Sequence, residues 1–485
     1  MNNLNDPLLL KTASYIDGCW HSNDDLISID NPATGEVLGQ VSNANIADVE
    51  LAIQAAKNAF KAWSAKPATE RSKILRNWFD LLIENQDDLA RILTLEQGKP
   101  LVEAKGEINY GAEFIEWFAE EGKRVYGETL PAPSSNKRML VVKQPVGVVA
   151  AITPWNFPNA MIARKAAAAL AAGCTFVVRP AIQTPFSALA MAELAHRAGI
   201  PPGVFNIVIG DDAAGIGKVL TEHEDVAKFT FTGSTQVGKL LISQSASTVK
   251  KVSMELGGNA PFIVFDDADI DAAVTGAIAS KYRNAGQTCV CVNRIFVHES
   301  VLADFTDKYV AKVKDLSIGN GLTKGINIGP LISKQAVNNV KNLVEESVLQ
   351  GAKVILGNND ELIGENFLAP IVLTGVTNDM PIACNEIFGP VSAIISFKEE
   401  SDAIEMANDT DFGLASYFYS RDIGRIWRVA ESLYYGLVGI NEGLITNVAA
   451  PFGGMKQSGY GKEGSKYGLD DYLEIKYLCM GGIDK

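Results

Sequence analysis

The sequence predicts an α/β protein with two domains, each built on a parallel sheet, and a small projecting arm. Apolar runs alternate with helical patterns between residues 146 and 258, and a second series of this kind starts near residue 260. Such alternation is typical of βαβ units with helices on both faces of a sheet. Two further segments fit neither series, and these predict the arm.

The first series predicts buried strands separated by helices. Short apolar runs bounded by turn residues are typical of strands that are covered on both faces. Strands are expected at residues 148–152, 175–178, 204–208 and 229–232, and helices at residues 163–172 and 186–198.

The second series continues the pattern beyond a Gly-rich segment at residues 256–259, where we expect the domain boundary. Its elements are a strand at 262–265, a helix at 270–282, a strand at 292–298 and a helix at 302–313. The predicted limits are 1–122 and 144–256 for a cofactor-binding domain, to which 449–466 return, and 257–448 for a catalytic domain.

The arm is predicted from two segments. Residues 123–143 carry Pro131, Pro133 and a Ser-Ser-Asn turn between extended flanks, which indicates a projecting hairpin. Residues 471–479 alternate in the manner of an edge strand. Because an unpaired edge usually needs covering, residues 123–143 and 467–485 are expected to contact another subunit.

Composition limits the class of partner. The 485 residues carry a formal charge of −14, which argues against nucleic acid or an anionic membrane surface as the main partner. No apolar run is long enough to span a bilayer, and the N-terminus lacks the basic start of a signal peptide, so a cytoplasmic location is expected. Six irregularly spaced cysteines predict no disulfide scaffold, and no His/Cys cluster has the spacing of a metal site.

Cys289 is the candidate nucleophile. It follows a Gly-Gln-Thr turn, and polar residues such as Asn284 and Gln287 precede it, where they supply dipoles rather than packing. Only the deprotonated sulfur attacks a carbonyl, and such dipoles favour it. The alternative is an inert buried cysteine, which is a frequent state of a free thiol.

Glu255 and Asn156 are candidates for a base and an oxyanion donor. Glu255 ends a predicted strand among Met254, Leu256 and Gly257, and burial there would raise its pKa toward the range of a general base. Asn156 lies in a turn stiffened by prolines and aromatics, and a rigid amide suits a developing negative charge. The alternatives are an exposed loop glutamate and an ordinary turn asparagine.

The segment from Gly233 through Ser234 to Gly238 follows a predicted strand and opens a helix. Glycine permits close approach, and the free N–H groups of a helix start favour phosphate. Simple strand–helix packing is the alternative reading of this spacing.

Together these segments resemble the aldehyde dehydrogenase family over essentially the full length. The resemblance implies a Rossmann-like cofactor domain and a catalytic domain. It implies that Cys289 is the nucleophile, Glu255 the base, Asn156 an oxyanion donor and Lys165 a proton relay. The family's Glu-x-Phe-Gly-Pro motif implies that Glu386 holds the nicotinamide ribose and that Phe388 packs beside the nicotinamide. Trp155 is also expected to bind the cofactor. A homotetramer or homodimer is also implied.

Within the family, residues 284–291, 441–445 and 463–468 look like the succinate-semialdehyde dehydrogenase branch. That branch holds the distal carboxylate of its aldehyde with two arginines and a serine, and the matching positions are Arg164, Arg283 and Thr446. Thr446 keeps the hydroxyl but adds a methyl group.

The cofactor is expected to be NADP, with NAD also accepted. Relatives that prefer NAD often carry a glutamate where this chain has Ile182, and that acid would repel a 2′-phosphate. Arg179 replaces a family lysine and is suited to pair with a phosphate.

Cys291 follows Cys289 by two residues, so both side chains point the same way in an extended chain. The resemblance implies a redox switch in which a bond between the two sulfurs silences the enzyme.

Three alternatives to this function stay open. Glutarate semialdehyde is one methylene longer than succinate semialdehyde, and a pocket discriminates one methylene by only about 1–3 kcal/mol. A non-catalytic binding protein on the same fold would be expected to lack Cys289 or Glu255. A cofactor-free thioester hydrolase would not need the motif around Glu386 and Phe388.

Overall fold

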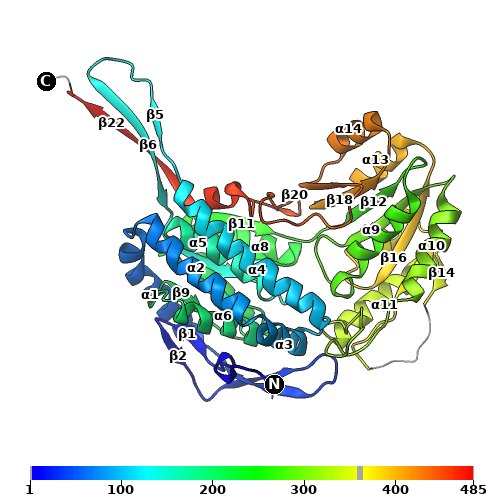
Figure 1. Cartoon of the computed structure of the whole chain (residues 1–485), viewed down its shortest axis with the longest axis horizontal. Coiled ribbons are helices and arrows are strands. Elements are labelled where there is room, and N and C mark those ends of the chain that lie inside the picture. Colours follow the sequence, from blue (N-terminus) through cyan, green and yellow to red (C-terminus); the bar gives the residue numbers. More distant parts are fainter. Residues whose placement is uncertain (1–2, 358–363, 484–485) are drawn as a thin grey trace.

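The computed structural model describes residues 3–357 and 364–483. Two large sheets lie in separate halves of the molecule, and a slender three-stranded sheet projects from the first half (Figure 1). Among the helices of the described ranges, none combines the length and the apolar character that a membrane crossing requires.

The first sheet has eight strands in the order β2-β1-β9-β8-β7-β10-β11-β21. Strands β7 to β11 are parallel to one another, whereas β1 and β21 pair antiparallel with their neighbours. Their bounds are Ser14–Ile16 (β1), Cys19–His21 (β2), Val148–Ile152 (β7), Thr175–Arg179 (β8), Phe205–Ile207 (β9), Val226–Thr232 (β10), Lys251–Glu255 (β11) and Gly459–Tyr460 (β21).

Helices cover both faces of this sheet, as the apolar runs predict. On β7, Val149 and Ala151 belong to the core beneath helices α2 to α6, while Val148 and Ala150 belong to the core beneath α1 and α7. This alternation follows from the two-residue period of a strand. The helices are α1 (Ile46–Ser64), α2 (Ala68–Glu84), α3 (Gln86–Gln97), α4 (Leu101–Glu121), α5 (Ala160–Ala172), α6 (Pro185–Arg197), α7 (Ala213–Glu222) and α8 (Thr235–Ser245).

The second sheet has seven strands in the order β14-β15-β16-β13-β12-β18-β19, all parallel except β14. The strands are β12 (Ala260–Val264), β13 (Val292–His298), β14 (Lys353–Leu356), β15 (Ile371–Thr374), β16 (Val391–Phe397), β18 (Ala415–Tyr419) and β19 (Leu437–Ile440). The helices that accompany them are α9 (Ile270–Tyr282), α10 (Leu302–Lys314), α11 (Lys334–Leu349), α12 (Pro381–Cys384), α13 (Glu400–Asn408) and α14 (Ile423–Ser432).

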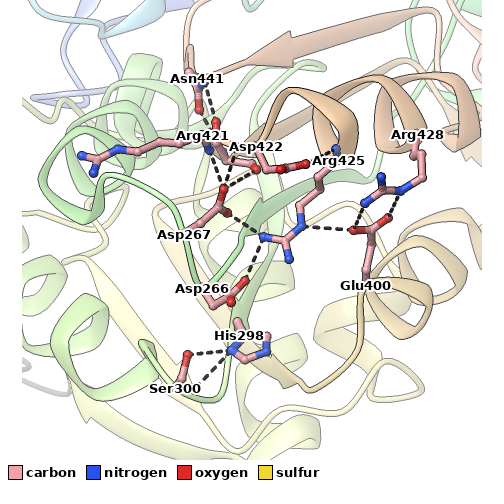
Figure 2. A network of polar contacts seen from close by, with 11 residues as sticks. Asp266, Asp267, His298, Ser300, Glu400, Arg421, Asp422, Arg425, Arg428 and Asn441 are labelled. Atoms are coloured by element: carbon pink, nitrogen blue, oxygen red, sulfur yellow. Dashed lines mark hydrogen bonds and ion pairs between the residues drawn. The ribbon is translucent and has the colours of Figure 1, made fainter.

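An ion-pair network joins the end of β12 to α13 and α14 (Figure 2). Asp267 accepts hydrogen bonds from the backbone of Arg421 and Asp422, and Arg425 bridges Asp267 to Glu400. The network fixes the start of α14 against the sheet.

The projecting arm consists of β5 (Glu128–Leu130), β6 (Lys137–Pro145) and β22 (Leu473–Gly481). The predicted hairpin and the predicted C-terminal strand are both present, and they pair with each other. β22 is the strand that the sequence predicts as an edge strand, and every residue of it after Leu473 is exposed. In the single chain, both faces of β22 therefore lack a protein cover.

Two small two-stranded sheets complete the sheet structure of the described residues. A separate hairpin joins β3 (Leu26–Asp30) to β4 (Val37–Ser42), and β17 (Phe412–Gly413) pairs with β20 (Met455–Lys456). The domain limits predicted above stay a prediction, although β21 does return from the C-terminal region to the edge of the first sheet.

Candidate active site

The site forms where the strand order of the first sheet reverses. The chain runs outward from β7 to β8 and β9, and then returns to place β10 and β11 on the other side of β7. In open parallel sheets, ligands bind at the carboxyl ends of strands at such a point. Glu255 is the last residue of β11, Gly233 directly follows β10, and Asn156 lies in the turn that follows β7.

A cavity of about 250 Å³ lies at this point. It contains seven of the residues predicted from the sequence, which come from both halves of the chain: Trp155, Asn156, Gly233, Ser234, Cys289, Glu386 and Phe388. The remaining lining residues are Pro154, Met161, Thr232, Leu256 and Gly257.

Cys289 follows a turn with unusual backbone geometry. Asn284, Ala285 and Gly286 have φ values of 51°, 55° and 80°, which lie in the left-handed region. Residues other than glycine adopt that region at a cost and are found there mainly at functional sites. Asn284 is held in place because its backbone N–H donates to Glu103 at 2.7 Å.

Burial of the Cys289 thiol raises its pKa to about 12, although the charge of Arg164 acts in the opposite direction. The resting thiol is therefore protonated, and it needs a base before it can act as a nucleophile.

Asn156 is held at its main chain and at its side chain. Its carbonyl oxygen accepts a hydrogen bond from Lys99 Nζ at 2.7 Å and one from Asn284 Nδ2 at 3.0 Å. Its own Nδ2 donates to the carbonyl of Gln287 at 3.1 Å. An amide carries two N–H donors, so one remains for a ligand in the cavity.

Glu255 is only 3% exposed and does not line the cavity. Burial, followed by the nearby charge of Glu463, raises the pKa of Glu255 well above its usual range. A carboxylate in this state accepts a proton readily, as a general base requires.

Lys165 and Arg164 lie on α5 behind Glu255, and both form ion pairs with the buried carboxylate of Glu463. Burial lowers the pKa of Lys165 in spite of that carboxylate. The two cations outweigh burial at Glu463 and hold its pKa below the usual range. Glu463 thus stays charged, and its negative charge is one of the causes that raise the pKa of Glu255.

A second cavity of about 440 Å³ lies on the other side of the Asn156 turn, and Phe157 and Arg283 line it. The Arg283 guanidinium stacks 4.9 Å above the Phe157 ring. Tyr110 lines the same cavity. The charges of Arg164 and Arg283 both act against the rise in the pKa of the Tyr110 hydroxyl that burial causes. Of the three predicted carboxylate-binding residues, Arg283 lines this cavity, whereas Arg164 and Thr446 line neither of the two cavities.

Four other predicted residues lie outside the first cavity. Arg179 is buried and donates twice to the carbonyl of Gly210, at 2.9 and 3.2 Å. Ile182 lines a different cavity of about 320 Å³. A Cβ at Gly238 would lie 2.4 Å from Leu256, so this glycine permits close packing of α8. Cys291 is buried, with its sulfur 3.4 Å from the carbonyl of Lys281.

The first cavity fits the nicotinamide end of a dinucleotide. Phe388 has a φ of 50° and meets Trp155 edge to face at a centroid distance of 5.7 Å. Burial raises the pKa of Glu386 to about 8, and its carboxylate accepts the backbone N–H of Gly258. Ser234 lines the cavity and caps α8 by accepting the backbone N–H of Val237, and the other free N–H groups of a helix start are suited to hold a pyrophosphate.

Two residues of this region, Glu463 and Tyr110, were not predicted from the sequence. Glu463 lies 298 residues from Lys165 along the chain, so no local pattern connects the two. Tyr110 lies within the long helix α4, where an aromatic residue normally signals packing. The one available signal is that Glu463 stands within the branch-specific segment 463–468.

Comparisons with known proteins agree with this geometry. A glutarate-semialdehyde dehydrogenase from Pseudomonas aeruginosa is 57% identical over 99% of this chain and all of its own length. The succinate-semialdehyde dehydrogenase [NADP(+)] GabD of Escherichia coli is 56% identical over 99% of both chains. The crystal structure of a succinate-semialdehyde dehydrogenase from Burkholderia pseudomallei superposes with a TM-score of 0.98 at 59% identity, over 99% of this chain and 100% of that one. Residues 20–478 match the model of the aldehyde dehydrogenase family, and the chain therefore belongs to that family.

Proposed function

We propose that this chain oxidises succinate semialdehyde to succinate with NADP⁺ or NAD⁺, through a thiohemiacetal and a thioester on Cys289. The observation that carries the proposal is that Cys289, Asn156 and Glu386 line one cavity at the reversal point of the first sheet. The family membership and the names of the relatives support the same activity.

The first step is attack by sulfur on the aldehyde carbon. Glu255 takes the thiol proton, and the Cys289 thiolate bonds to the carbon to form the thiohemiacetal oxyanion. The free N–H of Asn156 and the backbone N–H of Cys289 donate to that oxygen, and one such donor is worth roughly 2.7–4 kcal/mol of transition-state stabilisation.

Oxidation of that carbon leaves the acyl group on Cys289 as a thioester. When bound, the nicotinamide supplies the hydride acceptor for this step. Glu386 and Phe388 would hold its ribose and ring, and the start of α8 would hold the pyrophosphate. Glu255 releases the thiol proton to solvent and then takes a proton from water, whose oxygen adds to the acyl carbon. The C–S bond breaks, the carboxylic acid leaves, and the sulfur recovers its electron pair as a thiolate.

The distal carboxylate of the substrate is assigned to Arg164, Arg283 and Thr446. Guanidinium groups suit this role because their planar fork matches a carboxylate. Arg164 and Arg283 both act on the Tyr110 hydroxyl, which supports a common anion site for these residues.

NADP is proposed as the preferred cofactor, with NAD accepted. The name of the E. coli relative gives NADP(+), and Ile182 removes an acid that would repel a 2′-phosphate. Arg179 would contact the phosphate only after releasing the carbonyl of Gly210.

Glutarate semialdehyde is the second candidate substrate, because two Pseudomonas relatives at 57% and 58% identity carry that name. A third relative, at 56% identity, is named 3-sulfolactaldehyde dehydrogenase. All these names describe an aldehyde with an acidic group at its far end, which favours an anionic substrate over a neutral one.

The test measures the absorbance of the reduced cofactor with succinate semialdehyde, glutarate semialdehyde and butanal, each with NADP⁺ and with NAD⁺. We expect the highest kcat/KM with succinate semialdehyde and NADP⁺, and no turnover by Cys289→Ala although that variant still binds cofactor. Preference for butanal would refute the anion site, and turnover by Cys289→Ala would refute the nucleophile.

A further inference from the structure

Hydrogen bonds from a distant part of the chain hold Asn284 at the start of the turn before Cys289. Gln97, the last residue of α3, donates from Nε2 to Asn284 Oδ1 at 3.0 Å. The backbone N–H of Asn284 donates to Glu103 Oε2 at 2.7 Å, and Glu103 lies in the first turn of α4. The junction of α3 and α4 therefore supports the turn that carries the predicted nucleophile.

Asn284 also connects this turn to the turn of Asn156. Its Nδ2 donates to the carbonyl of Asn156 at 3.0 Å and to the carbonyl of Gln287 at 3.2 Å. The Asn156 side chain donates to that same Gln287 carbonyl at 3.1 Å. The place of Asn284 thus affects how the predicted nucleophile and the predicted oxyanion donor face each other.

The turn adopts a conformation that its own residues do not favour. Asn284 and Ala285 have φ values of 51° and 55°, and a side chain in this left-handed region crowds the backbone. Gly286 follows in the same region, and a Cβ there would lie 2.3 Å from the carbonyl oxygen of Gly389. Such backbone persists only where surrounding groups fix it, so the turn depends on the contacts of Asn284.

Glu103 differs from the other partners of Asn284 because it carries a carboxylate. Hydrogen bonds to an ionised acceptor are about twice as strong as those between neutral groups. Burial raises the pKa of Glu103. The charges of Lys99 and Arg283 act to lower that pKa, and so does the N–H that Glu103 accepts. Two cations therefore favour the ionised form, which holds the N–H of Asn284 most strongly.

Glu103 also lines the second cavity together with Arg283, the residue that directly precedes Asn284. This place allows two roles for the carboxylate. It balances the charge of Arg283 in the cavity, or it fixes the turn through Asn284. The first role acts on the binding of an anionic aldehyde, whereas the second acts on the reaction of the aldehyde once it is bound.

We propose that Glu103 is a positioning residue for the reaction: by accepting the N–H of Asn284, it holds the left-handed turn that presents the Cys289 sulfur beside Asn156. The inference rests on the role of Cys289 in the proposed function. Glu103 acts through the backbone of the turn rather than on the reacting atoms.

The test compares two substitutions of similar volume, Glu103→Gln and Glu103→Met, in the full-length protein. Glutamine keeps an oxygen that accepts the N–H of Asn284, whereas the methionine sulfur is only a weak acceptor. Glu113→Met is the matched control, because Glu113 lies on the same helix and is exposed. Glu103→Ala carries the test if Glu103→Met does not fold.

The measurement is the rate at which reduced cofactor forms in the first turnover, after rapid mixing with the acidic aldehyde that gives the highest kcat/KM. Cofactor and aldehyde are both saturating, so weaker binding does not change this rate. We expect Glu103→Met to slow it by about 10- to 100-fold, because a small misplacement of reacting groups costs up to about 100-fold. Glu103→Gln should stay within about fivefold of the wild type, since a neutral acceptor keeps part of the hydrogen bond.

A wild-type first-turnover rate in folded Glu103→Met would overturn the proposal. A change in KM alone would then assign Glu103 to the charge of the second cavity. Equal rates in Glu103→Gln and Glu103→Met would also overturn it, since the acceptor would not matter, and so would an equal loss in Glu113→Met.

Failure of the proposed function has a different signature, because it appears without any change at Glu103. The wild-type protein would then not reduce the cofactor with the acidic aldehydes, or Cys289→Ala would reduce it at the wild-type rate.

Discussion

Asn156 shows how a single side chain is fixed before the substrate arrives. Lys99 holds its carbonyl, and Lys99 is itself paired with Glu107 at 2.6 Å in a fully buried ion pair. Glu107 also accepts the backbone N–H of Asn159 at 3.0 Å. These buried charges lie away from the cavity and hold the backbone of Asn156 in place. A donor that is already in place needs no reorganisation when negative charge develops on the substrate oxygen.

Asn156→Ala should lower kcat roughly 100- to 1,000-fold, as expected for loss of one oxyanion donor. Cofactor affinity should change little, because the aromatic and carboxylate groups of the cavity remain. Steady-state kinetics and cofactor titration would measure the two effects. A variant that loses affinity while it keeps its kcat would contradict the oxyanion role.

At the residue scale, the sequence predicts those site residues that lie in local turns. Cys289, Asn156, Gly233 and Glu386 each stand at a Gly- or Pro-rich break after an apolar run, and the fold brings these breaks to one cavity. Glu463 was not predicted, because its partners lie on α5, about 300 residues earlier. Such contacts depend on how the two ends of the chain meet, and a local pattern does not contain that information.

At the scale of elements, helix α14 depends on a carboxylate from a different segment. Asp267 Oδ2 accepts hydrogen bonds from Ser420 Oγ and from the backbone of Arg421 and Asp422, at 2.8–2.9 Å (Figure 2). Partial burial opposes ionisation of Asp267, but these hydrogen bonds outweigh burial and hold its pKa below the usual 3.8. The anion also lies at the start of α14, where the helix dipole favours it.

Asp267→Asn should lower the free energy of unfolding by about 1–2 kcal/mol at pH 7, because a neutral amide oxygen accepts these hydrogen bonds more weakly than the carboxylate does. The folded-state pKa lies below the unfolded value, so the stability that ionised Asp267 contributes is present above about pH 3.8 and lost as the pH falls through the lowered pKa. Denaturant unfolding between pH 7 and pH 3 would measure the difference.

Asp266→Asn is the matched control for this variant. Asp266 forms an ion pair with Arg425 at 2.8 Å, and its side chain is 45% exposed. The control substitution should therefore lower the free energy of unfolding by less than about 0.5 kcal/mol. Equal losses of unfolding free energy in the two variants would contradict this role of Asp267. A loss in Asp267→Asn that grows toward acid pH would contradict it as well.

Element bounds were predicted best where apolar runs and capping residues agree. The helix at 270–282 and the strand at 292–298 have the predicted bounds, and Asp269 caps the helix. The helix predicted at 163–172 begins instead at Ala160, since the chain already turns into the helix after Asn159. Strand β22 exists as predicted, and its residues after Leu473 are exposed in the single chain.

At the scale of the whole molecule, the arm leaves apolar side chains in solvent. Ile475 is 71% exposed and Tyr477 is 51% exposed, and both point to the same face of β22. The arm extends well away from the two large sheets (Figure 1). A second copy of the chain that covered this face would bury apolar area worth about 1.5–3 kcal/mol for each large side chain.

The double variant Ile475→Asp/Tyr477→Asp should therefore shift the protein from the proposed homotetramer or homodimer toward a smaller species. Size-exclusion chromatography with light scattering would measure the mass. Lys476→Asp, on the opposite face of the same strand, is the control and should keep the wild-type mass. An unchanged mass of the double variant would show that this face is not a subunit contact.

Glu463 follows Arg164 and Lys165 by roughly 300 residues, so it leaves the ribosome long after the two cations with which it pairs. Until Glu463 is made, these two cations have no such counter-ion, and burying them would be costly. A chain that terminated before Glu463 would therefore lack the charge balance behind its base.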